Sequence, residues 1–233
     1  MSSLKAVNGH ERHREPRPAA RAIAYEHLVA LWSRPEIDLR EKLLWHMLYD
    51  TAARANEILA LNVEDLDPGR KRADITGKGG HRQTVVWASG TARLLPRYLP
   101  AATVDSPCFR EVHKCRWIVE RLAVGPRRRG PLFIGHRQPN VIPAEHDRCP
   151  DTGHARLSYQ RAWQLFHDNT ADWTLHQLRH SALTHLGEAG VSTLLLQAKS
   201  RRQDPRTLAR YAQPGIEAVA RLTADHDPNR RHH

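Results

Sequence analysis

The sequence predicts a mainly α-helical fold with a small antiparallel β-sheet, which belongs to the α+β class. Most apolar residues recur at spacings of three and four positions, which is the period of amphipathic helices. Two short segments, 73–76 and 84–87, have the composition of strands and flank the glycine-rich stretch 77–80, so they predict a hairpin. The length of 233 residues is enough for one well-packed domain.

Helical periodicity places the predicted elements along the chain. The strongest helix pattern lies in 37–53, where one face carries Leu39, Leu43, Leu44, Met47 and Leu48. Further helices are expected at 19–32, 89–99, 159–169 and 216–222, and another short strand at 131–134. Between 174 and 213 the chain restarts at Ser192, a preferred N-cap, and again at Asp204 followed by Pro205, which predicts three short helices.

These patterns divide the chain into three parts. Residues 1–36 are polar and basic, and we expect a partly disordered segment with one helix. Residues 37–225 are expected to form the packed domain, and 226–233 a charged tail.

The composition is strongly basic. The chain has 36 lysines and arginines against 25 acidic residues, a net charge of +11. Such an excess is typical of a polyanion partner, with nucleic acid first, although an arginine-rich proteome would give the same composition. The chain has no apolar run of about 20 residues, which argues against a bilayer span.

The cysteines favour a reduced, cytoplasmic protein. Cys108, Cys115 and Cys149 are odd in number and irregularly spaced, and the N-terminus has no apolar signal core. A zinc site could be built from these cysteines and His113, but these residues have neither CxxC nor HxxxH spacing. We therefore expect no metal and no cofactor.

The stretch 174–213 combines a hydrophobic scaffold with a polar cluster. On one helix, positions i, i+3 and i+4 share a face, so His176, Arg179 and His180 are expected to point the same way. Three short helices joined by tight turns would bring Tyr211 back toward Arg179.

This pattern resembles the C-terminal signature of the tyrosine recombinases, the phage-integrase family of site-specific DNA recombinases. The motif HQLRH is followed about thirty residues later by a lone tyrosine in RTLARYAQP. The family has His or Trp nine residues before this tyrosine, whereas Arg202 stands there in this chain.

Two further motifs carry the resemblance upstream. ARANEILALNVED matches the family's first catalytic-arginine motif, R-x-x-E-(I/L)-x-x-L-x-x-x-D, at Arg54, Glu57, Leu61 and Asp65. The segment TGKGG is similar to the family's β-hairpin with a catalytic lysine, which is Lys78 here. We therefore expect the tyrosine recombinase catalytic-domain fold over 37–225, with the sheet presenting Lys78 toward the other motifs.

The resemblance implies a metal-free DNA strand transferase that cleaves and rejoins strands through a 3′-phosphotyrosine. It assigns the nucleophile to Tyr211, the phosphate clamp to Arg54 and Arg179, and the leaving-group proton to Lys78. His176 and Arg202 would hold the phosphate or assist the nucleophile. The implied partners are double-stranded DNA and other recombinase protomers, and no membrane.

Simpler readings stand beside these roles. Arg54 and Glu57 could be a surface ion pair, TGKGG only a turn, His180 a packing residue and Tyr211 an ordinary surface tyrosine. The run 127–129, made of Arg127, Arg128 and Arg129, could be a solvated knuckle or a set of DNA contacts.

Two other functions remain open for the whole protein, because the sequence departs from the family pattern. About 36 residues precede the matching region, whereas family members usually carry an N-terminal helical domain. An impaired or truncated DNA-binding remnant of an integrase is therefore a second hypothesis, and an RNA-binding protein a third.

Overall fold

The computed structural model describes residues 22–77, 80–99, 127–137, 139, 141–170, 172–201, 204–208, 211 and 215–225. Its elements, in chain order, are α1 (Tyr25–Ser33), α2 (Leu39–Thr51), α3 (Ala55–Leu59), the 3-10 turn η1 (Val63–Asp65), β1 (Leu66–Asp67), β2 (Arg72–Thr76), β3 (Arg82–Val86), α4 (Ser89–Tyr98), the 3-10 turn η2 (Glu145–Asp147), α7 (Tyr159–Thr170), α8 (Leu175–Glu188), α9 (Thr193–Ser200), the 3-10 turn η3 (Pro205–Leu208) and α10 (Ile216–Asp225). The expected mainly helical fold with a small antiparallel sheet is confirmed.

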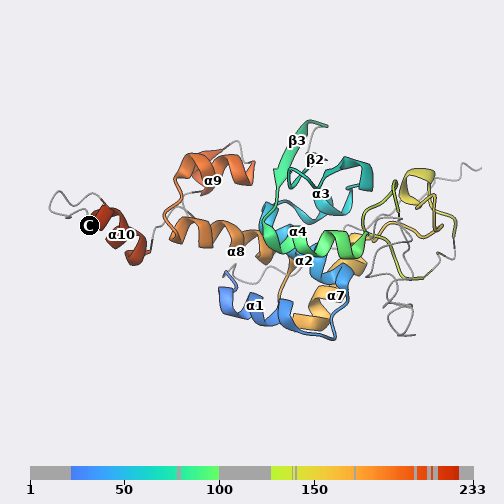
Figure 1. Cartoon of the computed structure of the whole chain (residues 1–233), viewed down its shortest axis with the longest axis horizontal. Coiled ribbons are helices and arrows are strands. Elements are labelled where there is room, and N and C mark those ends of the chain that lie inside the picture. The colour runs from blue at the N-terminus through green and yellow to red at the C-terminus, as the bar shows by residue number, and fades with distance from the viewer. Residues whose placement is uncertain are drawn as a thin grey trace, which may run out of the picture.

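Helix α2 is the centre of the fold, and it packs against α4, α7 and α8 (Figure 1). Its predicted apolar face is buried except for the partly buried Leu39. Trp45 is also buried, and its ring meets Phe166 of α7 edge-on at 5.1 Å between centroids. Burial extends to Arg40 and Glu41, which form an ion pair with each other. The helix is therefore buried on nearly all sides rather than on one face.

Helix α1 belongs to the same packed body. Leu28 and Leu31 are buried in the main hydrophobic core, and Trp32 stacks on His46 of α2 at 4.2 Å. Just before the helix, the Ile23 amide donates to Ser181 Oγ of α8 at 2.8 Å. The packed body therefore includes residues that the sequence assigned to the segment 1–36, outside the domain.

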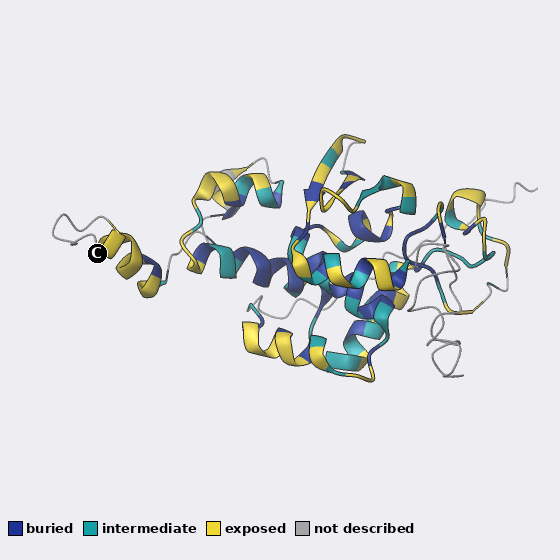
Figure 2. Ribbon diagram, in the orientation of Figure 1, coloured by how far each residue is buried: buried dark blue, intermediate teal, exposed yellow. Residues whose placement is uncertain are grey.

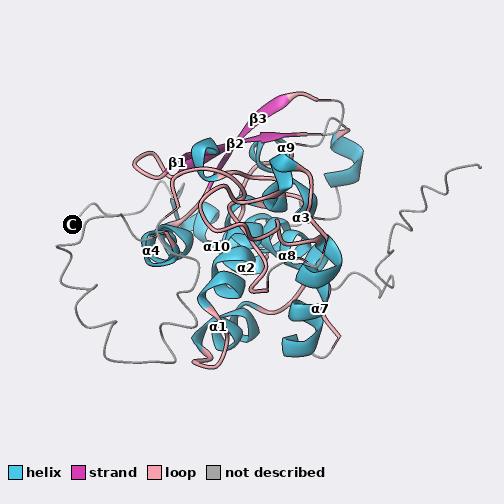
Figure 3. Cartoon of the chain, turned by 90° about the vertical axis from the view of Figure 1, so that its right-hand side faces the viewer, coloured by secondary structure: helices cyan, strands magenta, loops and turns pink. Residues whose placement is uncertain are grey.

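The sheet lies at one edge of the helical body (Figure 3). Its order is β1-β2-β3, all antiparallel, and Thr76 pairs with Arg82 where the hairpin opens. Ala73, Ile75 and Val85 are buried while their neighbours along the strands are exposed, as expected for a sheet with one face on the core. Strand β1 was not predicted, because two residues carry no detectable alternation.

The segment 131–134 is not the predicted strand. It makes isolated bridges, Asn62 with Pro131 and Ile134 with Arg156, while Leu132, Phe133 and Ile134 are buried. The apolar run is a buried segment that bridges to Asn62 on one side and to Arg156 on the other. Its apolar composition correctly indicated burial but did not indicate a regular strand.

A second, smaller core lies between the end of α2 and the C-terminal elements. It contains Ala52, Ala182, Leu183, Leu196, Leu208 and Tyr211. Beyond it, α10 projects from the body and buries only Ala218, as its exposed surface in Figure 2 shows. Within the described residues, no helix is long and apolar enough to cross a membrane.

Candidate active site

The junction between α2 and α3 holds the first motif. Ala52 ends α2 in the left-handed conformation, with φ of 48°, and Arg54 is the residue from which α3 begins. The Glu57 carboxylate accepts from the Arg54 amide at 2.9 Å and from Arg54 Nη1 at 2.7 Å. The expected ion pair therefore exists, but it is asymmetric, because the Arg54 side chain is 52% exposed and that of Glu57 only 6%.

Glu57 is held in its ionised form. Burial alone would raise the pKa of this carboxyl, but hydrogen bonds from Arg54 and the charges of Arg201 and Arg54 outweigh burial and lower the pKa. A buried, ionised carboxylate thus fixes one side of the Arg54 guanidinium, whose other side faces solvent.

Arg179 of α8 joins this junction to the end of α9. It is buried, its Nη1 donates to the Ala52 carbonyl, and its Nη2 donates to the Ser200 carbonyl at 2.7 Å. Both carbonyls lie at helix C-termini, where a cation is favourable. Arg179 therefore connects the end of α2, just before Arg54, with the end of α9.

Tyr211 and His180 pack together beside Arg179. Their ring centroids are 5.0 Å apart in an edge-to-face arrangement, and both side chains are buried. Tyr211 is 2% exposed, so it is not the ordinary surface tyrosine of the simpler reading.

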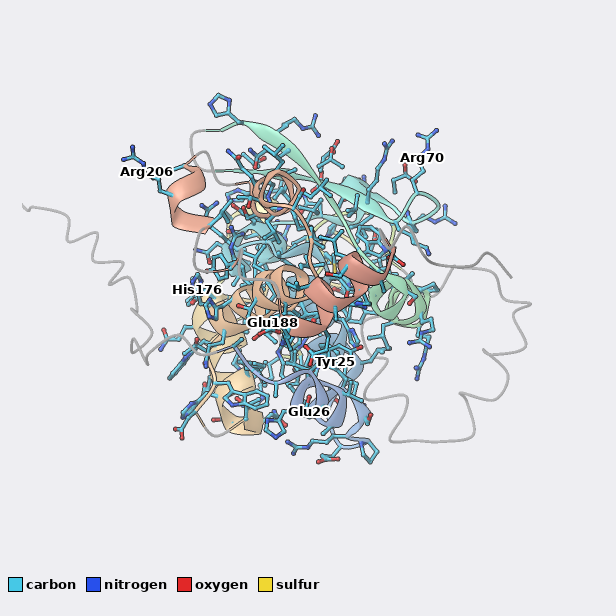
Figure 4. All side chains as sticks on the ribbon, turned by 90° about the vertical axis from the view of Figure 1, so that its left-hand side faces the viewer. Tyr25, Glu26, Arg70, His176, Glu188 and Arg206 are labelled. Atoms are coloured by element: carbon cyan, nitrogen blue, oxygen red, sulfur yellow. The ribbon has the colours of Figure 1, made fainter. Side chains whose placement is uncertain are left out.

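The exposed member of the HQLRH motif is His176. It lies in the first turn of α8 and is exposed, whereas Arg179 and His180 are buried (Figure 4). The motif therefore spans the boundary between solvent and core instead of lying on one face of uniform exposure.

Lys78 and Arg202 lie outside the described residues. On either side of Lys78, the Gly77 amide donates to the His81 carbonyl at 2.9 Å, and Gly80 has a φ of +80°. A left-handed residue in a tight hairpin favours glycine, as the stretch 77–80 provides.

Arg201 is the site residue that the sequence analysis missed. Its Nη2 lies 3.3 Å from Glu57 Oε2 and 3.3 Å from the Ala52 carbonyl, and its Nη1 donates to the Thr51 carbonyl at 3.3 Å. The family pattern, counted nine residues back from Tyr211, selects Arg202 and not its neighbour Arg201. Arg201 has a left-handed backbone, with φ of 55°. A glycine at this position would have indicated that conformation in the sequence, but an arginine does not.

The arginine run 127–129 does not act as one unit. Arg127 is buried, donates to the Pro131 and Leu132 carbonyls, and lies over the Tyr98 ring at 5.3 Å. The prediction of a solvated or DNA-contacting Arg127 is wrong, because its guanidinium satisfies buried carbonyls. Arg128 and Arg129 are exposed.

Within the described residues, no group of three or more His, Cys, Asp or Glu side chains could hold a metal ion. Cys149 is a buried free cysteine, while Cys108, His113 and Cys115 of the alternative zinc site lie outside these residues.

The fold and the clustered motifs define a catalytic domain of the phage integrase type. Residues 21–216 match the phage integrase family, and the chain belongs to this family. It is 28% identical to tyrosine recombinase XerC of Rhodospirillum centenum over 220 residues, which cover 93% of this chain and 55% of that protein. It is 26% identical to tyrosine recombinase XerD of Mycobacterium tuberculosis over 201 residues, or 84% of this chain and 54% of that protein. The chain thus spans about half the length of these relatives.

Solved structures share the fold. The XerA recombinase matches with a TM-score of 0.61 and 16% identity, over 94% of this chain and 68% of that one. The XerH site-specific recombinase bound to its difH substrate matches with a TM-score of 0.54 and 19% identity, over 89% and 55%.

Proposed function

We propose that this chain is a DNA strand transferase that cleaves and rejoins DNA through Tyr211. The observation that carries the proposal is the position of Arg179, which donates to the carbonyl of Ala52, two residues before Arg54, and to the carbonyl of Ser200 at the end of α9. Ala52 and Tyr211 are more than 150 positions apart in the sequence and belong to the same small core, which supports a shared site.

The chemistry follows from the phosphodiester. Its negative oxygens repel a nucleophile, so a metal-free site must supply fixed positive charge and a proton donor. The exposed Arg54 guanidinium contacts the non-bridging oxygens. The Tyr211 oxygen forms a bond to phosphorus while the bond to the 5′ oxygen breaks, and Lys78 donates the proton that this oxygen takes up. The resulting 3′-phosphotyrosine keeps the bond energy for rejoining.

Other residues assist these steps. His176 is exposed at the edge of the cluster, where it holds the phosphate or takes the phenol proton. Arg202 donates hydrogen bonds to the phosphate but exchanges no proton near neutral pH.

A second candidate function is favoured by the burial of Tyr211, which is 2% exposed. In that case the chain is a catalytically impaired member of the family that occupies DNA without cleaving it. Covalent capture separates the two, because both bind DNA and only the first forms an adduct.

Double-stranded DNA is the proposed partner. Arg70, Arg82 and Arg206 are exposed on the sheet and on η3, whereas Glu26 and Glu188 are exposed on α1 and α8. Figure 4 shows Arg70 and Arg206 at one edge of the body and the two glutamates away from that edge. Basic side chains release counterions when they meet phosphates, so affinity for DNA should fall steeply with salt. A solved relative, XerH, was crystallised with its DNA substrate.

A second protomer is the other proposed partner. The apolar residues Ile216, Val219 and Leu222 of α10 are 75%, 45% and 61% exposed. A cavity of about 400 Å³ opens between β3, α8 and α9, lined by apolar side chains such as Leu186 and by the cation Lys199. An α10 helix of another copy offers an apolar face to the apolar lining of this groove and Glu217 to Lys199.

The test uses a pool of duplexes with randomised sequence and a nick, so that a cleaved strand diffuses away and the adduct accumulates. We expect the wild-type chain to retain DNA through strong detergent and Tyr211→Phe to retain none, while both bind DNA in native gels. Equal adduct yields from the two proteins would exclude Tyr211 as the nucleophile. Binding without any adduct from the wild-type chain would favour the second candidate.

A further inference from the structure

We infer that Arg201 is a positioning residue, which acts through Glu57 to orient the Arg54 guanidinium and ties that guanidinium to the segment carrying Tyr211. The inference rests on the proposed function. Arg201 lies outside the motifs that identify the family in this sequence.

The backbone at Arg201 is costly for an arginine. It is the C-cap of α9 in the left-handed conformation, with φ of 55° and ψ of 31°, where glycine is the residue without a steric penalty. Within the described part of the chain, the buried Nε of Arg201 also has no hydrogen-bond acceptor. The contacts of the guanidinium must therefore offset the cost of this backbone and of the buried Nε.

Those contacts join two elements of the site. Nη1 donates to the Lys199 carbonyl of α9 at 3.1 Å and to the Thr51 carbonyl at the end of α2 at 3.3 Å. Nη2 donates to the Ala52 carbonyl and to Glu57, each at 3.3 Å. The Arg201 guanidinium therefore links the end of α9 to the end of α2. The chain continues from α9 to Tyr211 and from α2 to Arg54.

Glu57 transmits the position of Arg201 to Arg54. Its Oε2 accepts from Arg201 Nη2 and from the Arg54 amide, while its Oε1 accepts from Arg54 Nη1 at 2.7 Å. The carboxylate is thus shared between a buried arginine and an exposed one. If Arg201 is removed, Glu57 loses one of its two cations and can rotate toward solvent, and the Arg54 guanidinium follows.

Exposure separates the two arginines by role. The Arg201 side chain is 8% exposed and faces backbone carbonyls, whereas that of Arg54 is 52% exposed. A DNA phosphate can reach the exposed Arg54 guanidinium directly, whereas the Arg201 guanidinium is occupied by Glu57 and by backbone carbonyls. Arg201 therefore acts on the reaction through Arg54 rather than by contact with the substrate.

The first test measures Arg54 itself and needs no cleavage. We would record the side-chain Nε–Hε resonance of Arg54 in the full chain, assigned by its loss in Arg54→Lys. Arg201→Gln should shift and broaden this resonance, and Arg201→Lys should do so less, because lysine keeps the charge but not the fork. An unchanged resonance in Arg201→Gln would overturn the inference.

The matched control is Arg156→Gln. Arg156 is also a largely buried arginine, with 16% of its side chain exposed, and it donates to Asp147, Leu59 and Leu61. It should lower thermal stability as Arg201→Gln does, yet leave the Arg54 resonance in place. A similar change in both variants would mean that Arg201 has only a structural role.

The second test is a double-mutant cycle on adduct formation at saturating nicked DNA. Arg201→Gln should slow the reaction about tenfold to a hundredfold, the range in which small positional errors act, with DNA affinity within about threefold of wild type. In an Arg54→Lys background the same substitution should cost less than about threefold, since its target is gone. Equal losses in both backgrounds would contradict action through Arg54. If the wild-type chain forms no adduct, the proposed strand-transfer function fails while the resonance still decides the role of Arg201.

Discussion

Replacing the shared carboxylate, Glu57→Gln, tests the electrostatics of the site most sharply. The substitution keeps the shape of the side chain and one acceptor oxygen, but it removes the charge and turns an amide donor toward either Arg54 or Arg201. Donor then faces donor at one of the two contacts, which lie at 2.7 Å and 3.3 Å in the wild-type chain.

The size of the effect follows from burial and from hydrogen bonds. Removing one partner of a buried charge pair costs about 3–5 kcal/mol, and a single charge-assisted hydrogen bond contributes about 1.5–3 kcal/mol. Arg54 is half-exposed, so solvent screens its share. We expect the free energy of unfolding at pH 7 to fall by about 2–4 kcal/mol.

The pH dependence has a definite sign. Because the folded-state pKa of Glu57 lies below its ordinary value of 4.5, its contribution is complete above that value and is lost as the pH falls through the folded pKa. The difference between wild type and Glu57→Gln should therefore shrink in acid.

Urea unfolding from pH 7 down to about pH 3 measures this difference. Glu64→Gln is the control, since Glu64 is exposed and accepts one hydrogen bond, from the Gly130 amide at 2.8 Å. A loss below about 1 kcal/mol at pH 7, the level of an exposed pair, or a loss that is constant with pH, would refute the reasoning.

Three further outcomes are expected. Burial lowers the pKa of His185, whose Nδ1 lies 2.8 Å from Tyr49 Oη, so the free energy of unfolding should fall as the pH drops below about 6.5. His185→Gln should make the free energy of unfolding less dependent on pH in this range. An unchanged pH dependence would show that His185 is not the titrating group. Trp45→Ala should cost about 3–5 kcal/mol in denaturant unfolding, because Trp45 is fully buried in α2, and a cost below about 1 kcal/mol would deny α2 its central place. Leu222→Asp should reduce self-association in light scattering without changing the melting temperature, whereas an unchanged mass would remove α10 from the proposed protomer interface.

The fold could be predicted from periodicity where one period dominates. The apolar face of 37–53 predicted helix α2, and the strand composition on both sides of the glycine-rich stretch predicted β2 and β3. Ser192 was correctly predicted as an N-cap, and its side chain accepts from the Leu195 amide. The segment 131–134 failed, because an apolar run reports burial without reporting which backbone partners are available.

The site could be predicted only where a motif names residue types. The Arg54–Glu57 spacing identified an ion pair, and HQLRH identified Arg179, which donates to the Ala52 carbonyl. The same motif includes His180, whose ring packs against Tyr211. Arg127 was misassigned because a run of three arginines looks solvated, and its partners are backbone carbonyls that leave no trace in a sequence. Arg201 was missed for the same reason, since three of its four acceptors are carbonyls.

Peptide mapping of a trapped adduct shows whether Tyr211 joins DNA covalently. Trypsin should release Tyr211 at the start of the peptide YAQPGIEAVAR, residues 211–221, after cleavage at Arg210. After nuclease digestion, we expect this peptide to carry the mass of a 3′-phosphonucleotide on its tyrosine. A nucleotide attached to any other peptide, or an adduct that forms with this peptide unmodified, would contradict this expectation.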